Sequence, residues 1–258
     1  MRSKPLMVLI GLVVAATLLF SGSGMAVAQD NGGQVGAQAC VAPCLYDQLT
    51  LGQTNGWVSQ NFESLDSLCA SVGKLPQCMD NQAADDFTIP PGSFFWLVNK
   101  VEVDGFYQQP PSGYAAASAN VFFYNNSGSG SLPGTSSYQG SFVPGNLANG
   151  DFVIDLTPPA GLLAGRTYWV SVQANLDLGS DGRVWFWGLR GPPQDPLTGN
   201  LAAWINQGGG FTVGPCTTWG PLASCGGSDP GDTTDLQFRL SGSQINIAAR
   251  VYLPLISR

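Results

Sequence analysis

The chain contains no histidine, only two glutamates and few charges of either sign. The lack of histidine excludes a Ser-His-Asp or Cys-His catalytic centre and any His-ligated zinc or haem. Charged residues make up 10% of the 258 positions, against about 25% in an average soluble protein, and the net charge is −7. Because ten basic residues cannot form a basic stripe that displaces counterions, the composition predicts no nucleic-acid binding.

The first 28 residues have the composition of a secretory signal peptide. A basic start is followed by an apolar stretch over 6–20 and by the small residues Ala26 and Ala28 of a cleavage site. The apolar stretch is shorter than the about 20 residues that a membrane-spanning helix needs, and no second run of that length follows. We therefore expect cleavage after Ala28 and a secreted, extracellular or cell-surface protein without a membrane span.

The cysteine count points to the same compartment. The six cysteines all follow the predicted cleavage site, at Cys40, Cys44, Cys69, Cys78, Cys216 and Cys225. An even number of cysteines in an exported chain predicts disulfides, and the simplest pairing is 40–44, 69–78 and 216–225. A metal site is the alternative, but the spacings do not match a CxxC knuckle and no histidine is available.

Glycine (34 residues) and proline (18) are abundant and favour turns over long helices. Between the turn-rich stretches, short segments alternate apolar and polar residues with a period of two, typical of strands with one buried face. The candidate strands are 57–62, 85–89, 98–104, 119–124, 151–156, 166–174, 183–189 and 235–241. These about eight strands predict an all-β fold, an antiparallel, jelly-roll-like β-sandwich.

The apolar faces of these strands predict the core. Its expected members are Phe87, Ile89, Val101, Val103, Phe152, Ile154, Val170, Val172, Leu236 and Phe238. The segment 63–72 is the best candidate for a short helix, and the Gly/Ser-rich segment 125–150 is expected to form a long hairpin or loop. We predict a flexible leader over 29–44, one β-sandwich domain over 45–242, and a C-terminal tail or last strand over 243–258.

Several motifs occur together in a fixed order. They are AADDFTIP (83–90), GRTYWVSVQANLD (165–177), LAAWINQGGGF (201–211), CTTW beginning at Cys216 and TDLQFRLSG (234–242). From about residue 45 to 242 the chain thus resembles a group of exported bacterial β-sandwich domains found in surface proteins. The resemblance implies a fold and an exported location but no catalytic mechanism. The YLPL ending resembles the tails of exported Chloroflexi-type proteins, and the alternative is a last strand stopped by Pro254.

Tryptophans on polar strand faces suggest a ligand site. Trp169 shares the polar face of its predicted strand with Gln173 and Asn175, Trp57 lies beside polar neighbours, and Trp204 lies in a Gly-rich segment. An exposed indole can pack on the C–H face of a pyranose ring while amide side chains bind its hydroxyls. We predict that these five residues bind a glycan or another cell-surface ligand. The alternative is that the tryptophans belong to the core.

Aspartates cluster at the ends of the predicted strands. They are Asp85, Asp86, Asp177, Asp181 and Asp235. Strand ends from two sheets can meet at one edge of a sandwich, and clustered carboxylates with backbone carbonyls suit a structural Ca²⁺ ion. The alternative is that aspartate is frequent there because it stabilises turns through its own side-chain hydrogen bonds.

No catalytic constellation stands out. A glycosidase needs two facing carboxylates, and no spacing selects a pair. A serine nucleophile without histidine would need a lysine base, but neither Lys74 nor Lys100 lies in an SxxK pattern. We therefore expect a non-catalytic binding or adhesion module, or alternatively a structural component of the cell surface or matrix, with an extracellular hydrolase third. At least two exposed tryptophans beside Asn, Gln or Asp would favour the first class, and an unpaired flat edge strand the second.

Overall fold

Both the alternating and the continuous apolar segments form strands in the computed structural model. The structure describes residues 44–49, 55–62, 69, 79–108, 115–128, 131–145, 150–177, 183–190, 199–210, 216–225 and 235–247. The strands are β1 (Cys44–Asp47), β2 (Gly56–Val58), β3 (Gln60–Asn61), β4 (Gln82–Thr88), β5 (Phe94–Val103), β6 (Gly105–Gln108), β7 (Ser118–Asn126), β8 (Pro133–Phe142), β9 (Phe152–Leu163), β10 (Thr167–Asn175), β11 (Val184–Arg190), β12 (Ala203–Ile205), β13 (Gly220–Pro221), β14 (Asp235–Leu236) and β15 (Phe238–Asn246). One short helix, α3 (Leu222–Cys225), follows β13.

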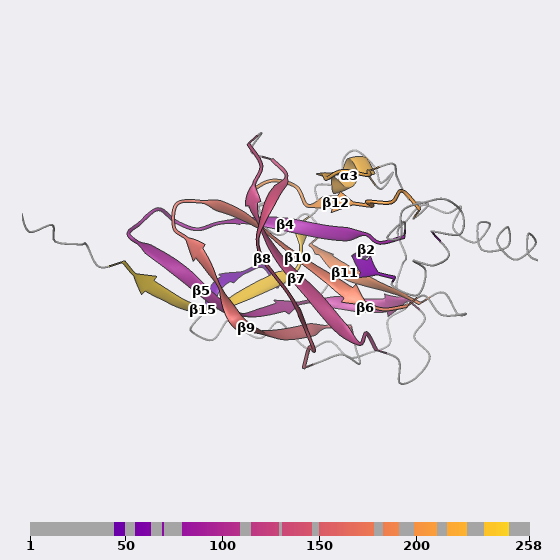
Figure 1. Cartoon of the computed structure of the whole chain (residues 1–258), viewed down its shortest axis with the longest axis horizontal. Helices are drawn as coiled ribbons and strands as arrows, with labels where there is room; N and C mark the ends of the chain where they lie inside the picture. The colour runs from indigo at the N-terminus through magenta and orange to yellow at the C-terminus, as the bar shows by residue number, and fades with distance from the viewer. Residues whose placement is uncertain are drawn as a thin grey trace, which may run out of the picture.

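Two sheets form the body of the molecule (Figure 1). One has four strands in the order β1-β15-β5-β9, and the other has the order β13-β12-β4-β10-β7-β8, with β3 added beside β10. A smaller sheet, β14-β11-β2, carries β6 on β11. Neighbouring strands pair antiparallel except β3 and β10, which pair in parallel over two residues. The prediction of an all-β, antiparallel sandwich is confirmed.

Aromatic rings link the inner faces of the two large sheets. Phe87 of β4 lies 6.3 Å from Trp96 of β5 and 6.1 Å from Phe238 of β15, measured between ring centroids. It also packs on Phe123 and Tyr168 within its own sheet. All ten predicted core residues are buried, so the register inferred from the alternating patterns is confirmed.

The elements extend beyond the predicted strands in several places. The segment 125–150 contains β8, which pairs with β7 as the second arm of a hairpin. β5 begins at Phe94, and β15 ends at Asn246, so the predicted domain boundary at 242 falls inside a strand. Of the predicted helix over 63–72, only Cys69 is among the described residues.

Other sequence predictions fall outside the described residues. These are the signal peptide over 1–28, nearly all of the leader over 29–44, Asp181, and the YLPL ending with Pro254 within 248–258. Within the described ranges, no helix has the length and apolar character needed to cross a membrane.

One of the three predicted disulfides is fully described. Cys216 and Cys225 are bonded, which confirms the 216–225 pair. Cys44 and Cys69 are also disulfide-bonded. Their predicted partners, Cys40 and Cys78, lie outside the described residues, so the 40–44 and 69–78 pairings stay predictions.

Candidate functional site

The predicted anchor Trp169 is not exposed, which corrects the expectation of a surface indole. Its side chain has no solvent-accessible surface, and its Nε1 donates a hydrogen bond to Asn126 Oδ1 at 2.9 Å. The residues packed around it include Ala203 from β12 and the half-buried Tyr124 and Trp219. Alternation correctly places Trp169 on the outer face of the sheet, but Trp219, Leu132 and Tyr124 cover it there.

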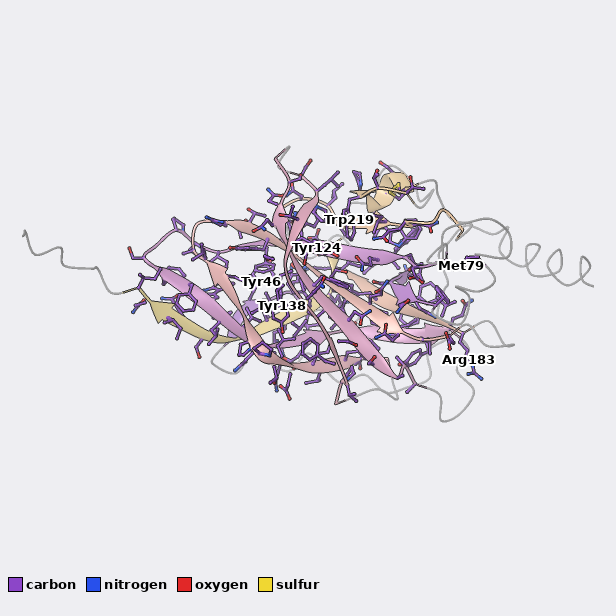
Figure 2. The ribbon with its side chains drawn as sticks, viewed as in Figure 1. Tyr46, Met79, Tyr124, Tyr138, Arg183 and Trp219 are labelled. Atoms are coloured by element: carbon purple, nitrogen blue, oxygen red, sulfur yellow. A yellow bond between two sulfur atoms is a disulfide. The ribbon has the colours of Figure 1, made fainter. Side chains whose placement is uncertain are left out.

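Trp219, which provides part of this cover, lies in the segment 216–225 that a disulfide closes. β13 in this segment pairs with β12, which itself pairs with β4. A side chain at Gly220 would meet Cys225 Sγ at 2.8 Å, so only glycine fits beside the disulfide. The ring centroids of Trp219 and Tyr124 lie 5.5 Å apart. Both residues are labelled in Figure 2.

The other predicted indoles are also buried. Trp57 is 2% exposed and makes an edge-to-face contact with Trp204 at 6.0 Å, and Trp204 Nε1 donates to Val58 O. Gln173 is 5% exposed and donates to Asn81 O. The prediction that these three side chains bind a ligand from the surface therefore loses its basis. The alternative, that the tryptophans are core residues, describes them correctly.

Asn175 differs from the other predicted ligand residues because it is half-exposed and forms the centre of a polar network. Its Oδ1 accepts from Asn61 Nδ2 and Asn120 Nδ2, both at 2.9 Å. Its Nδ2 donates to Asn120 Oδ1 at 2.9 Å and to Ser118 Oγ at 2.7 Å. We call the outer-face residues Asn61, Ser118, Asn120, Ser141, Gln173 and Asn175 the amide face.

Aromatic rings continue the amide face along β7. Phe122 and Tyr124 point to the same side as Asn120, because side chains two residues apart on a strand share a face. Both are half-buried, and their rings stack at 5.8 Å. Phe122 stands opposite the exposed Gln139 of β8. Burial raises the pKa of Tyr124, so its hydroxyl stays protonated and donates to Gln82 Oε1 at 2.9 Å.

Of the four predicted calcium ligands that the structure describes, Asp177 lies apart from Asp85, Asp86 and Asp235, and Asp181 lies outside the described residues. Asp85 pairs in register with Val170, while Asp177 lies seven residues further along the chain of β10, roughly 23 Å away for an extended strand. Asp177 is also exposed, whereas Asp85, Asp86 and Asp235 are 1% exposed. No group of three or more His, Cys, Asp or Glu side chains suited to a metal ion occurs in the part of the chain that the structure describes.

The buried aspartates are bound by protein donors instead. Asp85 Oδ2 accepts from Gln48 Nε2 at 2.7 Å and from the Leu236 amide at 2.6 Å. Asp86 accepts from the amide and the side chain of Asn200. Burial and the nearby charge of Asp235 raise the pKa of Asp85, and burial raises that of Asp86.

A further carboxyl pair was missed by the sequence analysis. Asp104, between β5 and β6, hydrogen-bonds to Asp151, which precedes β9 and accepts from the Gly105 amide at 3.1 Å. Burial, this hydrogen bond and the charge of Asp151 raise the pKa of Asp104 to about 7. The two residues lie 47 positions apart, so no local pattern could have paired them.

The fold and the outer face together define an antiparallel β-sandwich with a neutral surface of amides and aromatic rings. No protein-family model matches the chain, and no curated protein matches it in sequence. Among solved structures, the chain is similar to the cysteine protease and lectin-like domains of Cwp84, a surface layer associated protein of Clostridium difficile. The match has a TM-score of 0.40 and 11% identity, and covers 63% of this chain and 32% of that one.

Proposed function

We propose that the protein is a non-catalytic, exported binding module that recognises neutral carbohydrate on the outer face of its larger sheet. The observation that carries the proposal is the continuity of the amide face with the stacked rings of Phe122 and Tyr124 along one strand. The Cys216–Cys225 disulfide supports an oxidising, extracellular location.

The chemistry of this surface suits a sugar better than a charged ligand. None of the outer-face side chains of β7 and β10 over 118–126 and 169–175 is charged. A half-buried ring such as Phe122 offers apolar area to the C–H face of a pyranose, and amide groups offer both donors and acceptors to vicinal hydroxyls. Gln139, exposed opposite Phe122, adds a side chain that no neighbouring layer covers.

The network around Asn175 gives this surface a fixed shape. Each amide in it is held by one or more of the others, so the side chains are ordered before a ligand arrives. Preordered polar groups lose less conformational entropy on binding, which increases affinity. We therefore assign Phe122 and Gln139 to direct ligand contact and Asn175 to positioning Asn120.

The test is a glycan array followed by titration calorimetry with a soluble oligosaccharide hit. We expect Phe122→Ala to weaken binding about tenfold or more and Gln139→Ala to weaken it less, because buried aromatic contacts dominate binding energy. The matched control is Phe95→Ala, which removes a half-buried ring from the outer face of the other sheet. Calorimetry reports affinity per site, so a change in self-association does not mimic a loss. An array without hits would refute the proposal. An equal loss of affinity in Phe122→Ala and in the control Phe95→Ala would refute it too.

A second candidate is a structural component of a surface or matrix that assembles through contacts between its own copies. The observation that favours it is the exposure of Leu163, Ile245 and Ile247 at one end of the four-stranded sheet.

A further inference from the structure

Exposed apolar side chains gather at one end of the four-stranded sheet. The large hydrophobic side chains with the greatest exposure among the described residues are Val143 (74%), Ile247 (51%), Leu163 (44%) and Ile245 (39%). Three of these four lie where β15, β5 and β9 run side by side, at the end of the sheet that lies to the left in Figure 1.

Strand register brings these side chains into one row. Ile245 pairs with Phe95, and Phe95 pairs with Leu163, so three apolar residues stand next to one another across three strands. Leu97 and Ile247 lie two residues further along their chains on the same face. We call Phe95, Leu97, Leu163, Ile245 and Ile247 the apolar strip.

The opposite face of the same strands is already buried. Trp96 and Leu162 belong to the core and are 6% and 0% exposed. The first five residues of β5, Phe94 to Val98, are therefore apolar on both faces, whereas the later residues alternate with Lys100 and Glu102. A continuous apolar run is the pattern of a strand covered on both sides. Among the residues that the structure describes, none provides a layer over the strip, and a second apolar surface would supply one.

The lack of free charges beside the strip favours a neutral partner. The neighbouring row across the strands contains Ser243, Leu97 and Gly161, none of them charged. The outward-facing Lys100 is already paired with Asp155 at 3.5 Å. A polyanion or an anionic lipid surface needs several free basic groups, whereas a second neutral, apolar surface needs none.

We propose that the apolar strip is the interface through which two copies of this chain associate, with the two sheet ends packed face to face. In a two-fold arrangement centred on Phe95, Ile245 of one copy lies opposite Leu163 of the partner subunit, so the strip is complementary to itself. A standard interface buries about 800 Å² per partner. Five partly exposed side chains bury less area than that. The association is therefore weak and reversible.

Sedimentation velocity of the full exported chain, from about 1 to 500 μM, tests the proposal. We expect the weight-average mass to rise from monomer toward dimer with concentration, and Ile245→Asp and Leu163→Asp to stay monomeric throughout. The matched control is Val143→Asp, which places the same charge at an exposed aliphatic residue away from the strip and leaves the association unchanged. Circular dichroism checks that each variant keeps its β-sheet signal, and Leu163→Ser replaces any aspartate variant that loses it.

Three results would overturn the proposal. The first is a wild-type chain that stays monomeric at all concentrations. The second is an equal loss of association in Val143→Asp. The third is a wild-type chain that stays monomeric but sediments with phosphatidylcholine vesicles, while Ile245→Asp does not. In that case lipid, and not a second copy, covers the strip.

Discussion

At the scale of single residues, the Asp104 carboxyl couples folding to pH. Its pKa in the folded protein is about 7, above the ordinary value of 3.8, so the folded state keeps a proton that the unfolded state has lost between these values. The free energy of unfolding therefore falls as the pH rises from about 4 to about 7. Above pH 7 the partly buried Asp104 carboxyl is ionised in the folded protein as well.

Replacing Asp104 with asparagine should remove this dependence. The amide can still hydrogen-bond to Asp151 but carries no charge, so we expect Asp104→Asn to be more stable than the wild type by roughly 1–3 kcal/mol at pH 8 and similar to it near pH 4. Thermal melts at the two pH values measure the difference. Asp155→Asn, at an exposed ion pair, is the control. A variant that loses stability toward pH 8 as steeply as the wild type would assign the dependence to other groups.

Phe87 should be among the residues most sensitive to truncation, because its ring packs on the rings of both sheets. We expect Phe87→Ala to lower the free energy of unfolding by about 3–5 kcal/mol, the usual cost of emptying a buried phenylalanine site. Urea denaturation measures it. Phe122→Ala, at a half-buried ring on the outer face, should cost markedly less, and similar losses would mean that Phe122 is packed as tightly as the core.

At the scale of elements, local alternation predicted which strands form but not what covers them. β10 and β11 are buried on both faces over most of their length, so polar and apolar positions alike are shielded. Part of the cover over Trp169 comes from a segment about 50 residues further along the chain, and a local pattern contains no information about it. The segment containing β8 was predicted as a long hairpin or loop, and the pairing of β7 with β8 forms the hairpin. The bounds of β8 could not be predicted, because its Gly and Ser residues leave few apolar side chains to reveal the period.

The disulfide-closed segment 216–225 should protect β12 and β13, the strands that extend the sheet beside β4. We expect the double variant Cys216→Ser, Cys225→Ser to lose about 2–3 kcal/mol of stability, the chain-entropy contribution of a loop of this length. Hydrogen exchange followed by mass spectrometry should show faster amide exchange in β12 and β13, with β5 and β9 unchanged. Unchanged exchange in β12 would mean that strand pairing alone holds the segment in place.

At the scale of the whole molecule, the two large sheets have different outer faces. One carries the amide face and its aromatic rings, and the other ends in the apolar strip. Packing of two copies through the strip would leave both amide faces free, and each dimer would then present two ligand sites. Avidity for a surface that carries repeated sugars follows from such an arrangement without any new contact.

The burial of the tryptophans also gives the molecule an optical property. Six of the seven indoles are shielded from water, and Trp219, beside Tyr124, is the one that is half-exposed. Collisional quenchers such as iodide should therefore act on a single emitter whose spectrum lies to the red of the others. Because this emitter adjoins the surface on which Phe122 lies, the native protein carries its own fluorescent reporter at the proposed site, and no label is needed to follow binding there.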